Sequence, residues 1–317
     1  MLFLYKQHNN HIIAKMFRHF IYNNHTLRPI SIYVFNLSFQ KKENNGINNS
    51  LRESIIGAII NKKVPDEYYC DNKWNHMRTA IDNYIKLLNN KPYTHLKCEH
   101  KGGQKNHIDF NFIFSYDDES EEIFCIEFKY NASSIDDAPQ FISLGKPSIF
   151  MKNTENISYE ETFHRDNLPV LSKASGLSIP SRQEYISTIN SSDPVCMEAY
   201  KSLYKTDITF NELANEQYYS SAASYIEKSE LDISLLSKKL RETQNNKHYM
   251  LYNAEKGEFA LEKACIDDYE IESFTKTKNS YICVCKNGKK LNVLLRWKNN
   301  NGIAWPAFQI KSIKNKK

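Results

Sequence analysis

The sequence of residues 107–130, HIDFNFIFSYDDESEEIFCIEFKY, contains the strongest structural signal in this chain. Apolar residues occupy every second position on each side of an acidic segment, which predicts two β-strands joined by a turn. The alternating apolar residues are Ile108, Phe110, Phe112 and Phe114 in the first strand and Phe124, Ile126, Phe128 and Tyr130 in the second. The polar residues between them are therefore expected to share the opposite face of the hairpin.

The register of this hairpin determines which polar side chains meet. A hairpin folded about Asp118, with residues 116–120 as its loop, has a common connection length. This register places Asp109 opposite Glu127, with their β-carbons roughly 5 Å apart. Two like charges facing each other destabilise a sheet, and a divalent cation between them would remove that cost. Lys129 lies one step further along the same face.

Asp109, followed on the next strand by Glu127-Phe128-Lys129, is similar to the D…(D/E)XK signature of the PD-(D/E)XK nuclease superfamily, which includes many restriction endonucleases. The resemblance covers residues 51–144 as a helix, three strands, the first of them at residues 95–100, and a second helix. It implies that Asp109 and Glu127 bind one or two Mg²⁺ ions, for which Mn²⁺ can substitute. It also implies that Lys129 positions or activates the attacking water.

The chain departs from the family pattern at one position, because Ile108 stands where the family has proline. A literal Pro65-Asp66 occurs earlier, but no E-x-K follows it at hairpin distance, so we interpret it as unrelated to the motif. The alternative to a catalytic site is a surface hairpin in which Asp109, Glu127 and Lys129 are ordinary cross-strand residues.

Two accessory site residues follow from the resemblance alone. Some members of the family carry a metal-binding Glu on the first helix, which makes Glu53 a candidate third acid. Its helix is expected at residues 51–62, capped by Ser50 or Asn49, after an Asn- and Gly-rich linker or loop at residues 41–50. Other members use a helical Gln near the site, which makes Gln140 a candidate on a helix that begins near Ser134. The alternatives are a solvated first-turn Glu and a plain polar helix residue.

Basic and amide residues crowd the approach to Asp109 and are candidate phosphate contacts. They are Lys101, Gln104, Lys105 and His107, and the last of these is expected to face Lys129. A solvated loop explains the first three equally well, and a hydrogen-bonded structural role is more common for the histidine.

The composition of the 317-residue chain bounds its class. It carries 42 basic and 37 acidic residues, a net charge of +5, which is compatible with a polyanionic partner without establishing one. Seven scattered cysteines indicate a reducing, intracellular compartment, and the sequence does not distinguish cytoplasm from nucleus. Neither a signal peptide nor a membrane helix is predicted, so no membrane partner is expected.

The pattern along the chain predicts an α/β protein with a restriction-endonuclease-like core, in which helices flank a central mixed sheet. We expect an N-terminal extension (1–45), a nuclease core (46–150), a helical region (151–245) and a β-rich C-terminal region (246–317). Within the last region, Asn287-Gly288 predicts a two-residue type I′ hairpin. This C-terminal hairpin either extends the central sheet or forms a small domain of its own.

The leading functional hypothesis is a Mg²⁺-dependent endonuclease that hydrolyses DNA, and a restriction-type enzyme is preferred. The alternatives are a DNA repair or recombination nuclease, an RNA endonuclease, and a non-catalytic nucleic-acid-binding protein with the same fold. No G-x-x-x-x-G-K-[ST] phosphate loop is present, so ATP-driven translocation is not expected. A homodimer is an option that the sequence leaves open.

Overall fold

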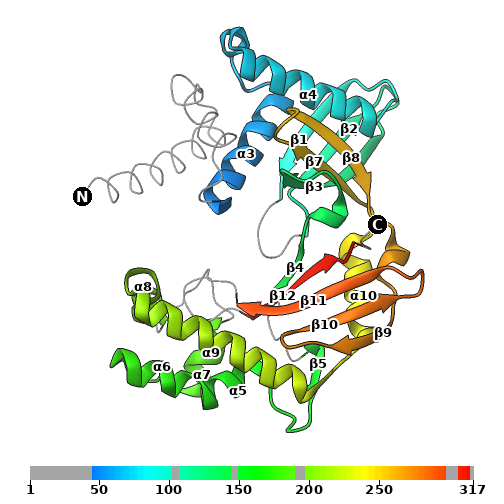
Figure 1. Cartoon of the computed structure of the whole chain (residues 1–317). Helices are drawn as coiled ribbons and strands as arrows, with labels where there is room; N and C mark the ends of the chain where they lie inside the picture. The colour runs from blue at the N-terminus through cyan, green and yellow to red at the C-terminus, as the bar shows by residue number, and fades with distance from the viewer. Residues whose placement is uncertain (1–44, 102–106, 144–148, 190–196, 298–305, 315–317) are drawn as a thin grey trace. The chain divides into compact units, whose positions relative to one another are not determined.

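The computed structural model describes residues 45–101, 107–143, 149–189, 197–297 and 306–314. Within them the chain divides into two compact units (Figure 1). The first unit contains the described parts of residues 1–135 together with residues 245–264, and the second contains residues 136–244 and 265–317. Each unit is built around its own five-stranded sheet.

The first unit combines two helices with a mixed sheet in the strand order β1-β2-β3-β7-β8. Its elements are α3 (Asn45–Ile60), the 3-10 helix η1 (Asp66–Cys70), α4 (Asn72–Leu88), β1 (His95–His100), β2 (Phe110–Ser115), β3 (Glu121–Tyr130), β7 (Lys247–Asn253) and β8 (Glu258–Lys263). β7 runs parallel to β3, and the other neighbouring strands are antiparallel. The predicted α/β class with a central mixed sheet is confirmed.

The register of the β2–β3 hairpin agrees with the predicted one. Asn111 pairs with Cys125 and Phe110 with Ile126, and the strands end and begin on either side of residues 116–120. Regular pairing begins at Phe110, so the first strand is shorter at its start than the alternation suggested. Asp109 therefore lies at the point where the β2–β3 ladder ends.

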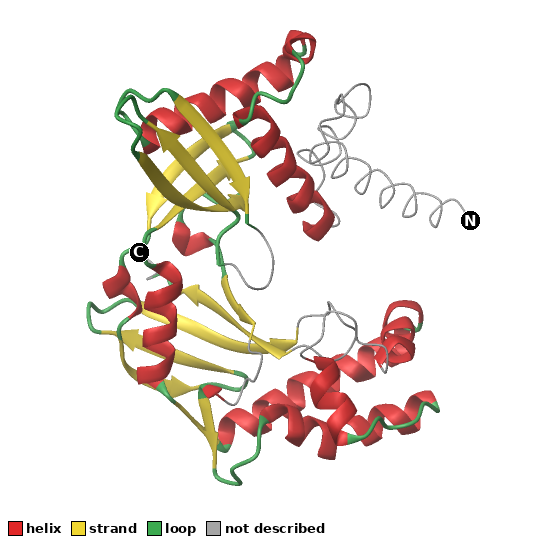
Figure 2. Ribbon diagram, turned by 180° about the vertical axis from the view of Figure 1, so that it is seen from behind, coloured by secondary structure: helices red, strands yellow, loops and turns green. Residues whose placement is uncertain are grey.

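One face of this sheet packs against α3 and α4 to form the core of the first unit (Figure 2). The apolar residues predicted to share a face do so: Phe110, Phe112, Phe114, Ile126 and Phe128 are buried in this core. Because side chains alternate along a strand, Glu127 and Lys129 lie on the other face.

Helix α3 corrects one expectation. Asn49 and Ser50 lie inside the helix rather than at its cap, where Asn49 accepts a hydrogen bond from Arg52 at 2.6 Å. Glu53 is consequently not in a first turn. The fully buried Arg52 guanidinium stacks over the Tyr130 ring, 3.3 Å from its centroid. Packing of this kind outweighs the local turn signal of the Asn- and Gly-rich segment.

The second unit joins a helical layer to an antiparallel sheet in the order β4-β12-β11-β10-β9. The strands are β4 (Gln140–Ser143), β9 (Ile271–Lys276), β10 (Ser280–Cys285), β11 (Lys290–Trp297) and β12 (Pro306–Ser312), with a separate pair β5 (Met151–Asn153) and β6 (Ser229–Leu231). The helices are α5 (Tyr159–Asp166), α6 (Leu168–Ser175), α7 (Arg182–Ile189), α8 (Glu198–Thr206), α9 (Ile208–Glu227) and α10 (Ile233–Gln244), with short 3-10 turns η2 (Ile135–Asp137), at the boundary between the units, and η5 (Ile266–Tyr269).

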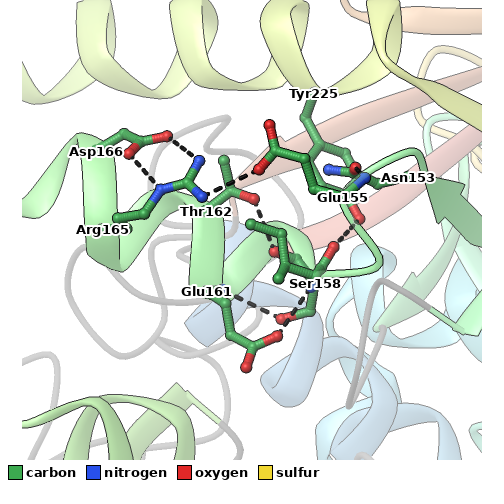
Figure 3. A network of polar contacts seen from close by, with 9 residues as sticks. Asn153, Glu155, Ser158, Glu161, Thr162, Arg165, Asp166 and Tyr225 are labelled. Atoms are coloured by element: carbon green, nitrogen blue, oxygen red, sulfur yellow. Dashed lines mark hydrogen bonds and ion pairs between the residues drawn. The ribbon is translucent and has the colours of Figure 1, made fainter.

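The start of α5 shows how local sequence fixes a helix in this unit (Figure 3). The Ser158 hydroxyl accepts from the Glu161 backbone N–H at 3.2 Å, and the Glu161 carboxylate accepts from the Ser158 N–H at 2.9 Å. This reciprocal capping box satisfies two amides that the helix itself leaves open. At the other end of α5, Arg165 donates to both Asp166 and Glu155.

The two units are interleaved in sequence, whereas the expected blocks were contiguous. β7 and β8 complete the first sheet, so part of the β-rich C-terminal region does extend the central sheet. The remaining strands β9–β12 form the second sheet, which β4 joins through its pairing with β12. The predicted C-terminal hairpin, β10–β11, therefore belongs to the second sheet and does not extend the sheet of the first unit.

The Asn287-Gly288 hairpin exists, but its turn type was predicted wrongly. The Cys285 N–H donates to Lys289 and the Gly288 N–H donates to Cys285, each at 2.8 Å, which closes a three-residue loop. Gly288 has a φ of +83° and Asn287 does not have a positive φ, whereas a type I′ turn requires both. A three-residue loop ending in a left-handed residue gives the same strand reversal.

Candidate active site

The candidate active site lies on the face of the first sheet that α3 and α4 do not cover. Glu127 and Lys129 project from it on β3, two residues apart. Their side chains are 13% and 23% exposed, and the Lys129 ammonium donates directly to Oε1 of Glu127. A buried strand that carries two charged side chains must compensate both, because unpaired charges are costly to remove from water.

Asp109 joins this pair from the end of β2. Its backbone N–H donates at 2.9 Å to the carbonyl of Ile126, which is already the partner of Phe110, so the register shifts by one residue where the ladder ends. Its carboxylate Oδ2 accepts from the Phe128 N–H at 2.8 Å. The side chain thus satisfies the β3 amide that lies between Glu127 and Lys129 in sequence, and this contact anchors the carboxyl beside them.

Glu127 is held by two lysines. Lys129 binds Oε1, and Lys247 at the start of β7 approaches Oε2 at 3.4 Å. Burial acts to raise the pKa of Glu127, but the two ammonium groups outweigh it and hold that pKa below its ordinary value. The same pairing raises the pKa of Lys129 against the opposing effect of burial. Glu127 is therefore an ionised carboxylate.

Asp109 has the opposite electrostatics. Burial, followed by the negative charges of Glu127 and Glu53, raises the pKa of Asp109 to about 7. Lys129 and the Phe128 N–H counteract only part of this rise. A strongly shifted carboxyl beside a specific charged partner is characteristic of functional sites, although structural ion-pair networks also produce such shifts.

Glu53 reaches the edge of the same cluster from α3. Its carboxylate Oε2 lies 2.7 Å from Nε2 of His100 on β1, and the two side chains are 16% and 23% exposed. Its charge acts on both Asp109 and Lys129. The structure thus brings Glu53 near the predicted pair, where it makes its direct contact with a histidine.

Two members of the cluster escaped the sequence analysis. His100 was assigned only to a strand, and Lys247 lies 120 residues from Glu127. Neither carries a local motif, because the contact of Lys247 depends on the parallel pairing of β7 with β3. A lysine at the start of an otherwise apolar strand, KHYMLYN, is the one signal that could have singled it out.

The other predicted site residues have mixed placements. Lys101 continues β1, with its N–H donating to the Asp109 carbonyl at 2.7 Å and its ammonium 3.0 Å from Glu99. His107 is exposed and precedes the regular pairing of β2, and Gln104 and Lys105 lie outside the described residues. The expected helix around Gln140 is wrong, because η2 is a single turn and Gln140 begins β4 in the second sheet, opposite Ile310.

The donor set of this cluster fits a hard cation bound by two carboxylates. Within the part of the chain that the structure describes, no three His, Cys, Asp or Glu side chains are arranged to hold a metal ion. Mg²⁺ is commonly held by one or two carboxylates, with water and substrate phosphate completing its shell. Burial and two nearby acids raise the pKa of Asp109, so it is a carboxyl whose ionisation a cation would favour.

Comparison with known proteins leaves the family open. No protein-family model matches the chain, and no curated protein matches it in sequence. Among solved structures, the chain is similar to the restriction endonuclease MspI in complex with its cognate DNA. That similarity has 10% sequence identity and a TM-score of 0.31, and covers 87% of this chain and 97% of the other. At this TM-score the similarity carries no weight for fold or function.

No helix in the described ranges combines the length and the apolar character that a membrane crossing requires.

Proposed function

We propose that this chain is a Mg²⁺-dependent endonuclease of the PD-(D/E)XK type that hydrolyses DNA phosphodiester bonds, and that it acts as a restriction-type enzyme. The observation that carries the proposal is the Asp109 carboxyl, anchored on the Phe128 N–H at 2.8 Å within the field of Glu127, together with the Lys129 ammonium on Glu127. A purely structural ion pair would not need a second acid whose pKa is raised to about 7 at the same place.

Asp109 and Glu127 would hold the cation between them. When bound, a divalent ion would stabilise the charge that develops on the phosphate and would lower the pKa of a water molecule. Glu127 enters this role already ionised, because Lys129 and Lys247 compensate its charge. Asp109 would lose its proton as the ion binds, since the ion replaces a repulsive environment with an attractive one.

Lys129 would act on the attacking water and on the phosphate. It is the more exposed of the two lysines on Glu127, at 23% against 4% for Lys247. Its ammonium is a compact charge on a flexible stem, which can turn from Glu127 to the phosphate when the carboxylate is engaged by an ion. There it would offset negative charge and orient the water for in-line attack.

The proposal is tested with supercoiled plasmid DNA, incubated with the wild-type chain in Mg²⁺ or in EDTA. We expect nicked or linear products in Mg²⁺ and none in EDTA. Lys129→Ala is expected to abolish cleavage, while Lys276→Ala, which breaks the ion pair of Lys276 with Glu230 in the second unit, leaves it intact. Equal cleavage by wild type and Lys129→Ala would exclude a role for this site.

The same assay separates the alternative functions. Cleavage of RNA in place of DNA would identify a ribonuclease. Preference for branched or damaged duplexes over intact plasmid would indicate a repair or recombination enzyme. DNA binding that is independent of Mg²⁺, with no cleavage under any condition, would indicate a binding protein that keeps the fold.

A further inference from the structure

Lys247 is the most buried charged group of the cluster and has no role in the motif. Its side chain is 4% exposed, and its ammonium lies 3.4 Å from Oε2 of Glu127 and 5.8 Å from the centroid of the Tyr249 ring. Burying an ammonium is costly unless a specific partner compensates its charge. A lysine at this position therefore needs an explanation beyond packing.

The two lysines on Glu127 differ in what they can reach. Lys129 and Glu127 lie on one strand, so their contact is local. Lys247 comes from β7, where the parallel register places it beside Cys125. At 4% exposure its ammonium cannot contact a substrate phosphate in solvent. Its action is confined to the carboxylate that it touches.

We propose that Lys247 is a positioning residue, whose ammonium holds Oε2 of Glu127 so that Oε1 is the oxygen presented to the cation. This inference rests on the proposed function and extends it to a residue outside the motif. Lys129 then exchanges Oε1 for the substrate when the cation binds, while Lys247 keeps its contact throughout. Catalysis would then depend on Lys247, although its side chain does not contact the DNA.

If Lys247 acted only through its positive charge, it would repel the cation, and its removal would strengthen cation binding. If Lys247 instead orients Glu127, its removal should weaken binding, because one ligand is then free to turn away. The direction of the change separates the two roles.

The first experiment measures Mn²⁺ binding by calorimetry, which requires no turnover. Lys247→Met, which keeps the length of the side chain, is expected to weaken Mn²⁺ binding by about ten-fold or more, and Lys247→Arg to restore part of it. Lys129→Met is expected to leave the affinity unchanged or to strengthen it, since it frees Oε1. Unchanged or tighter binding in Lys247→Met would overturn the inference.

A second experiment, in metal-free protein, keeps the inference distinct from the proposed function. Urea unfolding of Lys247→Met, Glu127→Gln and the double variant forms a double-mutant cycle. We expect Lys247→Met to lower the midpoint clearly in the wild-type background and much less in Glu127→Gln. Lys289→Met, another ion-paired and mostly buried lysine, lies in the second unit and should be additive with Glu127→Gln.

The two experiments together separate the role of Lys247 from the proposed function. If the wild-type chain binds Mn²⁺ and cleaves DNA but the cycle is additive, Lys247 does not position Glu127, and the nuclease function is retained. If the wild-type chain neither binds Mn²⁺ nor cleaves DNA, the nuclease function is excluded. The role of Lys247 in catalysis is then excluded as well, even if the cycle shows that Lys247 and Glu127 are coupled.

Discussion

Each of the two units contains a lysine–carboxylate cluster, and the acids of the two clusters are compensated differently. In the second unit Lys289 binds Asp136 at 2.8 Å and Asp268 at 2.7 Å. Its ammonium holds the pKa of Asp136 below the ordinary value against the effect of burial. In the first unit two lysines converge on Glu127, while burial and nearby acids raise the pKa of Asp109 to about 7.

We interpret this difference as one between a structural ion-pair cluster and a cluster that is suited to bind a cation. Around Lys289 each acid has its own contact with the ammonium, and for Asp136 this contact lowers the pKa against the effect of burial. In the first unit Glu127 takes both ammonium groups and Asp109 keeps only partial compensation. Sites that bind ions or substrates often retain such electrostatic strain, because the ligand relieves it.

Activity should show the largest contrast. Glu127→Gln removes the carboxylate proposed to hold the cation while keeping its shape, and should reduce plasmid cleavage in Mg²⁺ by about 10³-fold. Asp268→Asn removes a carboxylate from the other cluster and should leave the cleavage rate within about two-fold. Equal losses in the two variants, measured as initial nicking rates, would contradict the distinction between the clusters.

The pH dependence of stability should have opposite signs in the two clusters. Because the pKa of Asp109 is raised from 3.8 to about 7, the folded chain holds this proton longer than the unfolded chain does. Asp109 therefore costs the metal-free protein stability as pH rises from about 4 to about 7, by a few kcal/mol at most. Asp109→Asn should flatten this decline and stabilise the protein at pH 8.

Asp136 supplies the matched control for that measurement. Its pKa is lowered by Lys289, so its contribution is present above about pH 4 and is lost as pH falls through the lower folded value. Asp136→Asn should thus destabilise the protein at pH 7 and have little effect near pH 2. Urea unfolding at a series of pH values in EDTA measures both variants, and a shared sign would contradict the contrast.

Cation binding should stabilise only the first cluster. Mg²⁺ at about ten times its dissociation constant should stabilise the wild-type chain by roughly 1.4 kcal/mol. The effect should vanish in Glu127→Gln and persist in Asp268→Asn, as measured by thermal unfolding with and without Mg²⁺. A loss of Mg²⁺ stabilisation in Asp268→Asn alone would place the ion in the wrong unit.

The smallest effect concerns the two hairpin turns, which share one geometry. The Tyr116 N–H donates to Ser120 and the Glu119 N–H to Tyr116, so this loop matches the one that ends at Gly288. Glu119 has a φ of +63°, a conformation that costs an L-residue about 1 kcal/mol. Glu119→Gly should therefore stabilise the chain by up to about 1 kcal/mol, and Gly288→Ala should destabilise it by a similar amount.

Both turn variants are read from chemical unfolding. Opposite signs of the two changes would support the shared turn geometry, and a destabilising Glu119→Gly would argue against it.

Local periodicity sufficed for the elements near the motif. The alternation of Phe110, Phe112 and Phe114 with polar residues specified a strand, its buried face and, through the turn length, its pairing with β3. The first strand, residues 95–100, was also predicted with its observed bounds. Signals of this kind succeed because the pleat repeats every two residues and a one-residue slip would expose the core face.

Local signals failed where tertiary contacts overrode them. The Asn- and Gly-rich segment before Leu51 was expected to be a loop, and its described part belongs to α3. Gln140 was expected on a helix, but pairing with β12, more than 160 residues away, makes its segment a strand. Weak propensities lose to burial and ladder hydrogen bonds, which a local window does not contain.

Alternation and turn length are local signals, and they were enough to predict the β2–β3 hairpin and its register over residues 110–115. The contact of Lys247 on β7 with Glu127 and the Glu53–His100 pair could not be predicted in this way, because they come from the tertiary structure. It also decided which acid is compensated. The charge state of a buried carboxyl depends on every group within a few ångströms, and those groups come from strands and helices far apart in the chain.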